Sequence, residues 1–445
     1  MYSETIIALA TGINGAIATL RMSGKESISI AQNMFNGRSP LKKEKGFTLH
    51  FGDIIDKDGN TIDQVLLSLF RSPSSYTGED MVEISCHAST FIVHEIIKRA
   101  LELGARSADA GEFTLRAYTN GKMDIVQAEG VADLIASTSA AGHRLAINQM
   151  RGGYSKEFVA LRAKLLHFMS MIELELDFSD EDVEFADRTQ LRNLLLEIKI
   201  KIETLISSFN SGNAIKSGVP VAIVGKPNVG KSTLLNRLLG EERAIVSEIA
   251  GTTRDTIEDT KTIGGVMFRF IDTAGIRQSI DTIELIGIER TFEKLQKASV
   301  VLLLIDTLSD LEKSISSLNL APHQKLIILL NKYDLNPIPL IHSDIPLFAI
   351  SAKQNIGISE LETYLSSLFN TKEDEVIITN TRHWELLTLS LDGINRALEG
   401  LLNNIPTDFI SQDIQESLHH LGSLTGEITS EAILHNIFAS FCIGK

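Results

Sequence analysis

Cysteine is scarce in this sequence, because the 445 residues include only Cys86 and Cys442. Two thiols cannot form the disulfide framework that holds small secreted domains together. A fold built on a buried apolar core in a reducing compartment is therefore expected, which indicates the cytoplasm. The chain also begins without a basic segment followed by an apolar run, so no signal peptide is expected.

Long apolar runs are missing as well. Val300–Ile305 and Leu326–Leu330 are among the longest, whereas a membrane-spanning helix needs about 20 predominantly apolar residues. These runs have the length of buried strands, so no membrane span is expected.

Positive charge is in deficit. Lys and Arg number 42 against 57 Asp and Glu, which gives a net charge of −15 at pH 7. Binding along a nucleic-acid backbone needs clustered Lys and Arg, so this chain alone is not expected to hold nucleic acid over a broad surface. A local basic patch or a basic partner protein is still compatible with this charge. The hydrophobic fraction of 43% is ordinary for a globular protein, and the length suits about two to four domains.

The first 120 residues show an α+β pattern. Apolar segments bounded by Gly, Ser and Asn predict strands at Ile6–Leu9, Ala18–Met22, Val65–Phe70 and Met81–Ile84. The helical spacing of apolar residues predicts a helix at Phe91–Leu103.

A helical region follows, because from Val126 to Phe209 the apolar residues recur every three or four positions. One broad helix face is predicted to contain Phe158, Leu161, Leu165, Phe168, Met169 and Ile172. The acidic segment Asp177–Glu184 interrupts this region, and a helix resumes at Gln190–Phe209. The composition of Ser211–Ser217 predicts a linker.

Strands then alternate with helices, which predicts a mostly parallel sheet with helices on both faces. The predicted strands are Val221–Val224, Phe268–Ile271, Val300–Ile305, Leu326–Leu330 and Leu347–Ile350. This α/β region ends near Asn370, and Trp384–Phe441 is helical again. The chain is either three consecutive domains or a helical domain interrupted by the α/β domain. The second arrangement is favoured, because the helical tail is short and apolar and domain termini commonly lie close together.

The segment Gly225–Ser232 matches the phosphate-loop pattern G-x-x-x-x-G-K-[ST], with a strand before it and a helix predicted at Ser232–Leu239 after it. Glycines let backbone N–H groups point at phosphate oxygens, and the N-terminus of the helix adds the positive end of its dipole. Lys231 is expected to reach the β and γ phosphates, and the Ser232 hydroxyl is expected to bind Mg²⁺.

Three further segments indicate GTP rather than ATP. Asp272–Gly275 is placed to hold Mg²⁺ through water and to sense the γ-phosphate. Asn331–Asp334 carries a carboxylate that can accept two N–H bonds from guanine, which adenine cannot offer. Ser351–Lys353 offers the Ala352 N–H to the guanine carbonyl.

Gly251–Asp255 is a polar loop in which Thr253 is a candidate second Mg²⁺ ligand when GTP orders the loop. Hydrolysis also needs a group that orients the attacking water. In Ras-like proteins a glutamine directly after Asp-Thr-Ala-Gly does this, but here that position is Ile276. Position alone leaves four polar candidates open, Arg277, Gln278, Asp281 and Glu284.

Asn228, inside the phosphate loop, is a second clue to the mechanism. Its amide oxygen can coordinate a monovalent cation beside the phosphates, and that cation would supply the positive charge that an arginine finger supplies elsewhere. The alternative is that Asn228 bonds its own backbone.

Several segments outside the phosphate loop form a further pattern. They are Tyr76–Asp80, Gly111–Thr114, Asn120–Glu129, Gly251–Asp255, Asp272–Arg277, Glu284–Glu289 and the ending Phe441–Lys445. With them the chain resembles the MnmE (TrmE) family of tRNA-modification GTPases over nearly its full length. The chain departs from the family pattern at Thr11–Ile17, at Gln278 and at Cys86–Ser89, where Ala-Ser replaces the usual Gly-Gly.

This resemblance implies a tetrahydrofolate-binding, dimerising α+β domain at 1–120. It also implies an all-helical domain at 121–216 plus 371–445, with an inserted Ras-like phosphate-loop GTPase domain at 217–370. The homodimer would work with a flavin-dependent partner of the MnmG type in a heterotetramer. Together they would add an aminomethyl or carboxymethylaminomethyl group at the wobble uridine of certain tRNAs. The carbon would come from formyl-tetrahydrofolate or a related folate, and FAD and NADH would belong to the partner.

The resemblance also assigns roles to single residues. Glu284 takes the position of the catalytic glutamate. Potassium, which with GTP would bring two GTPase domains together, would be bound by Asn228, Ser247, Ile249 and Thr252. Mg²⁺ would be bound by Ser232 and Thr253, and the folate by Arg21, Glu83, Lys122 and Lys445. The predicted GTP-binding residues are Asn228, Val229, Gly230, Lys231, Ser232, Thr233, Ser247, Glu248, Ile249, Ala250, Gly251, Thr252, Thr253, Asp272, Thr273, Ala274, Gly275, Asn331, Lys332, Asp334, Ser351, Ala352 and Lys353.

Two other functions stay open at this stage. A ribosome-assembly GTPase acting as an RNA-binding switch would carry a basic module after Asn370, and a pure dimerisation switch would bind no folate. Cys442 lies four residues from the end, as in a prenylation box, but Gly444 and Lys445 do not suit one and no polybasic stretch precedes it. Cys442 is therefore either a packing residue or a participant in the modification chemistry.

Overall fold

The structure is a computed structural model. It describes residues 4–13, 15–177, 187–240, 259–271, 295–316, 318–335, 337, 344–369, 377–403, 405–439, 441 and 444. The chain divides into two compact units, which are described separately. The first contains Met1–Ala132, Gln149–Ala186 and Thr407–Lys445, and the second contains Asp133–Asn148 and Asp187–Pro406. The expected domain boundaries at 120, 216 and 370 stay predictions.

The first unit contains a seven-stranded sheet with the strand order β3-β4-β5-β6-β2-β1-β7. Its strands are β1 (Ile6–Leu9), β2 (Ile17–Ser23), β3 (Phe35–Gly37), β4 (Thr48–Ile55), β5 (Thr61–Phe70), β6 (Met81–His87) and β7 (Arg106–Ser107). β1 pairs with β7 in parallel, and the other pairs are antiparallel. The four strands predicted from the sequence are confirmed, whereas β3, β4 and β7 were not predicted.

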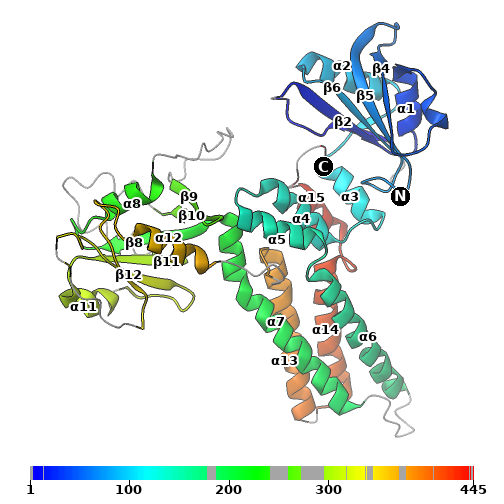
Figure 1. The fold of residues 1–445 in the computed structure, drawn as a ribbon. Coiled ribbons are helices and arrows are strands. Elements are labelled where there is room, and N and C mark those ends of the chain that lie inside the picture. Colours follow the sequence, from blue (N-terminus) through cyan, green and yellow to red (C-terminus); the bar gives the residue numbers. More distant parts are fainter. Residues whose placement is uncertain are drawn as a thin grey trace. The chain divides into compact units, whose positions relative to one another are not determined.

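One face of this sheet is covered by helices. The other face is buried at β1, where Ile6 and Ala8 pack against Phe113, and is open at β4 and β5. Helices α1 (Ser27–Met34) and α2 (Thr90–Glu102) bury their apolar residues against alternate residues of the strands (Figure 1), and the short 3₁₀ helix Leu41–Lys43 adds Leu41 to the same core. The alternation of a strand sends successive side chains to opposite faces. The open face accordingly carries Leu49 and Phe51 of β4 and Leu66 of β5, all exposed, and Phe51 lies directly across from Leu66.

The other helices of the first unit come from both ends of the chain. They are α3 (Glu112–Thr119), α4 (Ile125–Ala136, of which the part up to Ala132 belongs to this unit), α6 (Ser155–Asp177), α14 (Thr407–Thr425) and α15 (Glu431–Ala439). α6 packs against α14, and α15 packs against α3. The predicted apolar face of α6 is confirmed, since five of its six residues are buried and Phe168 is half-buried.

The second unit contains a six-stranded sheet with the order β13-β12-β11-β8-β10-β9. Its strands are β8 (Val219–Gly225), β9 (Asp259–Ile263), β10 (Val266–Phe270), β11 (Val300–Ile305), β12 (Lys325–Leu330) and β13 (Leu347–Ala349). β9 and β10 are antiparallel and the other pairs are parallel, so the predicted mostly parallel sheet is confirmed. The order, with the phosphate loop after the central strand β8, is that of a Ras-like domain, as predicted.

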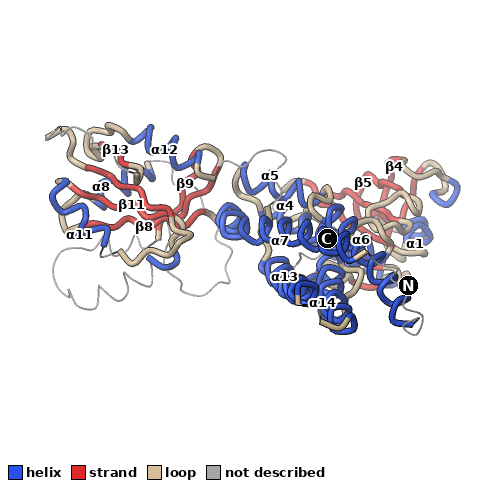
Figure 2. The backbone as a smooth tube through the Cα atoms, turned by 90° about the horizontal axis from the view of Figure 1, so that it is seen from below, coloured by secondary structure: helices blue, strands red, loops and turns tan. Residues whose placement is uncertain are grey.

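Helices cover both faces of this sheet, as the strands (red) lying between helices (blue) in Figure 2 show. Leu302 and Leu304 of β11 face α8 (Lys231–Leu239) and α12 (Ile358–Ser367). Leu303 and Ile305 face the opposite side, where the 3₁₀ helix Leu308–Asp310 and helix α11 (Leu311–Ser316) pack. Burial on both faces explains why this strand is a continuous apolar run. No helix among the described residues is both long and apolar enough to cross a membrane.

Helix α7 (Arg188–Ser217) precedes the first strand of this sheet in the chain, and α13 (Thr381–Leu402) follows the α/β region. The two helices pack against each other, and the rings of Phe209 and Trp384 stack with centroids 5.7 Å apart. Asp187 caps α7 by accepting the Thr189 N–H at 2.8 Å, which satisfies one of the free donors of the first turn.

The prediction of a linker at Ser211–Ser217 is wrong, because α7 continues to Ser217. Ala214 and Ile215 are buried in the core of the sheet, so tertiary packing outweighs the polar composition of this segment. Gly212 allows the close approach of the returning chain, since a Cβ at this position would lie 2.2 Å from the Ile378 carbonyl oxygen.

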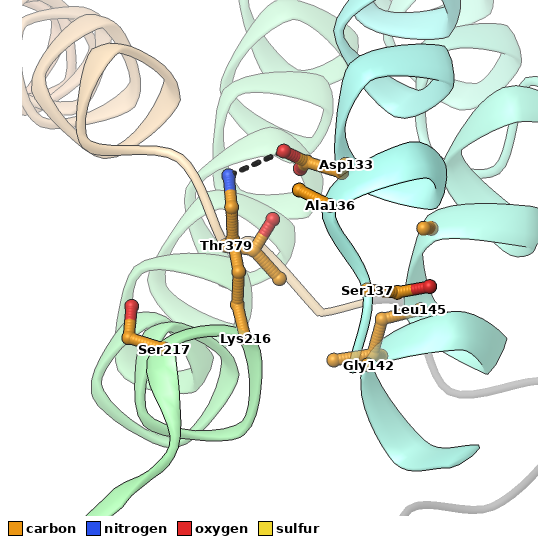
Figure 3. Close-up of a pocket in the computed structure, with 9 residues that line it drawn as sticks. Asp133, Ala136, Ser137, Gly142, Leu145, Lys216, Ser217 and Thr379 are labelled. Atoms are coloured by element: carbon orange, nitrogen blue, oxygen red, sulfur yellow. Dashed lines mark ion pairs between the residues drawn. The ribbon is translucent and has the colours of Figure 1, made fainter. Parts of the chain in front are cut away.

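A cavity of about 170 Å³ lies where α7 meets the sheet (Figure 3). Lys216 and Ser217 at the end of α7 line it together with Thr379, which precedes α13. Asp133 and the first turns of α5 (Ala140–Met150) complete the lining, and Asp133 forms an ion pair with Lys216 at 2.7 Å. The outgoing and returning chain segments therefore meet at one place.

Candidate functional site

The loop between β8 and α8 has a backbone that requires glycine. Gly225 and Gly230 have φ angles of 151° and 104°. A Cβ would lie 2.3 Å from the Leu304 carbonyl oxygen at Gly225, and 2.3 Å from Asn331 Nδ2 at Gly230. Asn228 also has a positive φ, 59°, and its side chain is exposed. The loop can therefore curl tightly at the start of α8, as the predicted phosphate site needs.

Lys231, the first residue of α8, folds back over this loop. Its Nζ donates hydrogen bonds to the carbonyl oxygens of Gly225 at 2.7 Å and Lys226 at 2.8 Å. Burial lowers the pKa of the Lys231 ammonium, because the charged form loses water. A phosphate oxygen is a far stronger acceptor than these carbonyl groups, and Lys231 stands where it would meet one. Ser232 and Thr233 follow in the same first turn.

Asn331 joins the phosphate loop to the two segments predicted to hold guanine. Its side chain is 5% exposed. Asn331 Nδ2 donates to the Val229 carbonyl oxygen at 2.7 Å, and Asn331 Oδ1 accepts the Ala352 N–H at 3.1 Å. Three sequence motifs predicted to act together are thus brought together by a single amide group.

Of Asp334 and Ala352, the two residues predicted to contact guanine, only Asp334 lies at the surface. The Asp334 side chain is exposed, whereas Ser351 and Ala352 are buried. Lys332 has a φ of 62°, and its Nζ lies 3.4 Å from Asp306 Oδ2. The exposed carboxylate of Asp334 can accept N–H groups from a base.

Arg237 is a member of this site that the sequence motifs missed. From α8 it donates to the carbonyl oxygens of Ala352 at 3.2 Å and Lys353 at 3.1 Å. It thereby fixes the loop that carries Ser351–Lys353. Only its position nearly two turns along the helix after the phosphate loop could have suggested this role.

Many of the predicted nucleotide and metal residues lie outside the described residues. They are Ser247, Glu248, Ile249, Ala250, Gly251, Thr252, Thr253, Asp272, Thr273, Ala274, Gly275 and Glu284. The other candidates for orienting water, Arg277, Gln278 and Asp281, lie there too, as do Cys442 and Lys445.

A second predicted site lies on the sheet of the first unit. Arg21 on β2 and Glu83 on β6 are direct cross-strand partners, and Arg21 Nη2 lies 2.7 Å from Glu83 Oε1. The Arg21 guanidinium also lies over two aromatic rings, 5.2 Å from the centroid of Tyr76 and 5.7 Å from that of Phe113. This pair presents a cation and a carboxylate side by side on a rigid support.

The last residues of the chain reach this pair. Arg21 Nη1 donates to the Gly444 carbonyl oxygen at 3.3 Å. Gly444 has a φ of 94°, and a Cβ there would lie 2.2 Å from the Leu9 carbonyl oxygen. Lys122 approaches the segment that carries Tyr76, because its Nζ donates to the Pro73 carbonyl oxygen at 3.0 Å. Of the four predicted folate residues, Arg21 and Glu83 are in contact with each other, and Lys122 bonds the segment that leads to Tyr76.

The departure at Cys86–Ser89 falls at the end of β6. Burial, and then the nearby Asp63 carboxylate, raise the pKa of the Cys86 thiol to about 11. Such a thiol is inert at neutral pH and acts as a packing residue. Ala88, which stands where the family usually has glycine, packs its methyl group against the apolar core of the sheet.

Comparison with known proteins identifies the family. Residues 125–442 match the family model of the MnmE helical domain, and residues 5–122 match that of the GTP-binding protein TrmE N-terminus. The tRNA modification GTPase MnmE of Flavobacterium johnsoniae is 52% identical and aligns over 99% of each chain. The protein of the same name from Bacteroides fragilis ATCC 25285 is 52% identical over 100% of each chain.

Some solved structures are similar to part of this chain. The G domain of the T. maritima FeoB iron transporter is 26% identical and covers 34% of this chain and 99% of its own, with a TM-score of 0.26. The fold of the α/β region is established by its strand order and its motifs. With matches to both family models and half of its residues identical to full-length relatives, this chain belongs to the MnmE (TrmE) family of tRNA-modification GTPases.

Proposed function

We propose that this GTPase couples GTP hydrolysis to the addition of an aminomethyl or carboxymethylaminomethyl group at the wobble uridine of certain tRNAs. The observation that carries the nucleotide assignment is the contact of Asn331 with both Val229 and Ala352, which holds the phosphate and guanine segments in one site. The names of the relatives, tRNA modification GTPases, support the coupling.

Two cations would complete the nucleotide site. Ser232, in the first turn of α8, and Thr253 would bind Mg²⁺, which would neutralise phosphate charge. Asn228, with Ser247, Ile249 and Thr252, would bind potassium. The exposed side chain and the positive φ of Asn228 support this role. Asn228 belongs to the phosphate loop itself, so its exposed amide would lie near a bound phosphate. With GTP, potassium would bring the GTPase domains of two chains together.

Glu284 would act on the attacking water through hydrogen bonds. The position that a glutamine holds in Ras-like proteins is Ile276, which has no polar group. Hydrolysis by this chain would thus depend on Glu284 and on the charge that potassium supplies.

The first unit would bind formyl-tetrahydrofolate or a related folate through Arg21, Glu83, Lys122 and Lys445. Arg21 and Lys122 suit the negatively charged or carbonyl oxygens of the ligand, and Glu83 suits its N–H groups. The pair formed by Arg21 and Glu83, at 2.7 Å on adjacent strands, supports this assignment, since both charges are held ready at one point of the sheet. Cys442 would take part in the modification chemistry nearby.

The chain would work as a homodimer, with residues 1–120 as the dimerising domain. The open sheet face with Phe47, Leu49, Phe51 and Leu66 supports this, because exposed apolar clusters mark association surfaces. Each dimer would join an MnmG-type flavoprotein, carrying FAD and NADH, in a heterotetramer. That partner would hold much of the tRNA, which agrees with the net charge of −15 here. The complex would act in the cytoplasm.

A ribosome-assembly GTPase is the second candidate. It would carry a basic RNA-binding module after the α/β region. The described residues that follow form α13, α14 and α15, and each of these helices packs against an earlier helix of the chain. The first proposal is therefore preferred.

GTP hydrolysis by the full chain in KCl against NaCl tests the nucleotide mechanism, with Glu284→Ala measured alongside. We expect fast turnover only in potassium and only with Glu284. Equal rates in both salts would rule out the potassium site, and full activity of the Glu284→Ala variant would rule out a catalytic role for Glu284. Isothermal titration with 5-formyl-tetrahydrofolate tests the folate site, and the absence of heat from the folded dimer would reject it.

A further inference from the structure

A buried ion network lies beneath the Arg21–Glu83 pair. Its centre is Arg116 of α3, whose side chain is 0% exposed. Arg116 Nη1 lies 3.0 Å from Glu79 Oε2, and Arg116 Nη2 lies 2.9 Å from Glu112 Oε1. Arg116 Nη1 also donates to the Glu4 carbonyl oxygen at 3.0 Å. One guanidinium therefore joins two carboxylates that come from separate segments of the chain.

Each carboxylate is tied onward to its own segment. Glu79 accepts the Ser23 hydroxyl at 2.8 Å, and Ser23 also bonds the Thr77 hydroxyl at 2.7 Å. Glu112 accepts Arg106 Nη2 at 2.7 Å. Ser23 belongs to β2, two residues beyond Arg21, so this network is attached directly to the strand that presents the Arg21 guanidinium.

The same two segments carry the rings under Arg21. Tyr76 is three residues before Glu79, and Phe113 follows Glu112. The Tyr76 hydroxyl bonds the Thr114 hydroxyl at 2.9 Å, which joins the segments a second time. Movement of either carboxylate would therefore shift the ring beside it and the guanidinium above.

The chemistry of arginine suits this role. Its guanidinium stays charged at every accessible pH and presents its donors in a planar fork, so it can bond two carboxylates at fixed angles. A lysine ammonium would keep the charge without that fork. Without any cation here, the half-buried Glu79 and the buried Glu112 would lose part of their compensating charge, and one of them would have to move.

We propose that Arg116 is a positioning residue for the folate site, which acts through Arg21. The bridge from Glu79 to Glu112 holds Tyr76 and Phe113 where they support the Arg21 guanidinium for an anionic ligand. This inference rests on the proposed folate binding. It also gives a function to the segments Tyr76–Asp80 and Gly111–Thr114, whose roles the sequence motifs left unassigned.

The test is the affinity of the full chain for 5-formyl-tetrahydrofolate, measured by isothermal titration well below the melting temperature. Arg116→Met is expected to weaken binding by roughly tenfold or more, the scale on which a displaced supporting group acts. Arg116→Lys is expected to be intermediate. Lys98→Met removes an exposed ion pair with Glu95 on α2 and serves as the matched control, with unchanged affinity expected.

A double-mutant cycle separates positioning from general destabilisation. If Arg116 acts through Arg21, then Arg116→Met causes no further loss of affinity in an Arg21→Met background, which is titrated to higher ligand concentration. The same fold-loss in both backgrounds, or wild-type affinity in Arg116→Met, would overturn the proposal. Where Arg116→Met fails to fold, Glu79→Gln keeps the shape of the network and is expected to weaken binding in the same Arg21-dependent way.

Two outcomes keep the proposals apart. Failure of the wild-type chain to bind the folate rejects the folate site itself, and the role of Arg116 with it. Binding by the wild-type chain that is insensitive to Arg116 rejects the positioning role alone. GTP hydrolysis by each variant, which depends on the other unit, checks that the rest of the chain is folded.

Discussion

Replacing Asn331 by alanine would break both contacts that join the phosphate loop to the guanine segments. The substitution leaves the Val229 carbonyl and the Ala352 N–H without their partner in a site where Asn331 is only 5% exposed. A buried polar group left unsatisfied costs about 1–3 kcal/mol. Two such groups, partly relieved by water, give an expected loss of about 2–4 kcal/mol shared between folding stability and nucleotide affinity.

The share that falls on nucleotide affinity can be measured directly. A loss of about 1.4 kcal/mol weakens binding tenfold, so we expect Asn331→Ala to raise the Kd for a fluorescent GDP analogue by at least about tenfold. Titration of the analogue gives the affinity. Urea unfolding, followed by far-ultraviolet circular dichroism, gives the stability. Asn236→Ala, which removes an exposed amide from α8 of the same unit, is the control and should change neither quantity. Wild-type affinity in a folded Asn331→Ala protein would refute the reasoning.

Three further predictions concern packing and ionisation. Gly212→Ala places a methyl group 2.2 Å from the Ile378 carbonyl oxygen. Thermal unfolding should therefore show that the free energy of unfolding falls by about 1–3 kcal/mol. Gly12→Ala, with open space around the new methyl group, is the control and should leave stability unchanged. Burial opposes the ionisation of Glu112, but hydrogen bonds from Arg106, the Asp109 N–H and Arg116 outweigh it and lower its pKa. The stability difference between wild type and Glu112→Gln should therefore be constant at neutral pH and shrink as pH falls below about 4.5, the usual value; a constant difference down to pH 3 would contradict this. The pKa of Cys86 is raised to about 11, so its thiol is protonated at pH 8. A Cys442→Ser chain should therefore react with a disulfide reagent at pH 8 only after denaturation. Rapid labelling of the native variant would show that Cys86 is accessible as a thiolate and would contradict this prediction.

The second sheet could be predicted from the sequence because its central strands are buried on both faces. Such strands are unbroken apolar runs, as in Val300–Ile305, and the loops that follow them carry recognisable motifs. β4 was missed because its residues are mixed in burial, with Leu49 and Phe51 exposed and only Ile54 fully buried. The end of α7 was missed because its stability comes from the core it meets and not from its own composition.

The candidate sites were predictable only as local motifs. The phosphate loop is contiguous, so its glycines and Lys231 could be assigned by spacing. Asn331, in contrast, bonds a residue 102 positions away, and Arg116 bonds Glu79 at a separation of 37. No periodicity in the chain encodes such pairs, since they depend on strand order and on which faces meet. The sequence motifs could mark Tyr76–Asp80 and Gly111–Thr114 but could not show that one arginine joins them.

The meeting of Lys216, Ser217 and Thr379 around one cavity has a consequence for how this chain is assembled. Because the chain leaves and returns at the same point, the whole segment between α7 and α13 forms one closed loop. The entropic cost of closing such a loop grows only with the logarithm of its length. α7 and α13 can therefore pair with little dependence on the size of the segment that separates them.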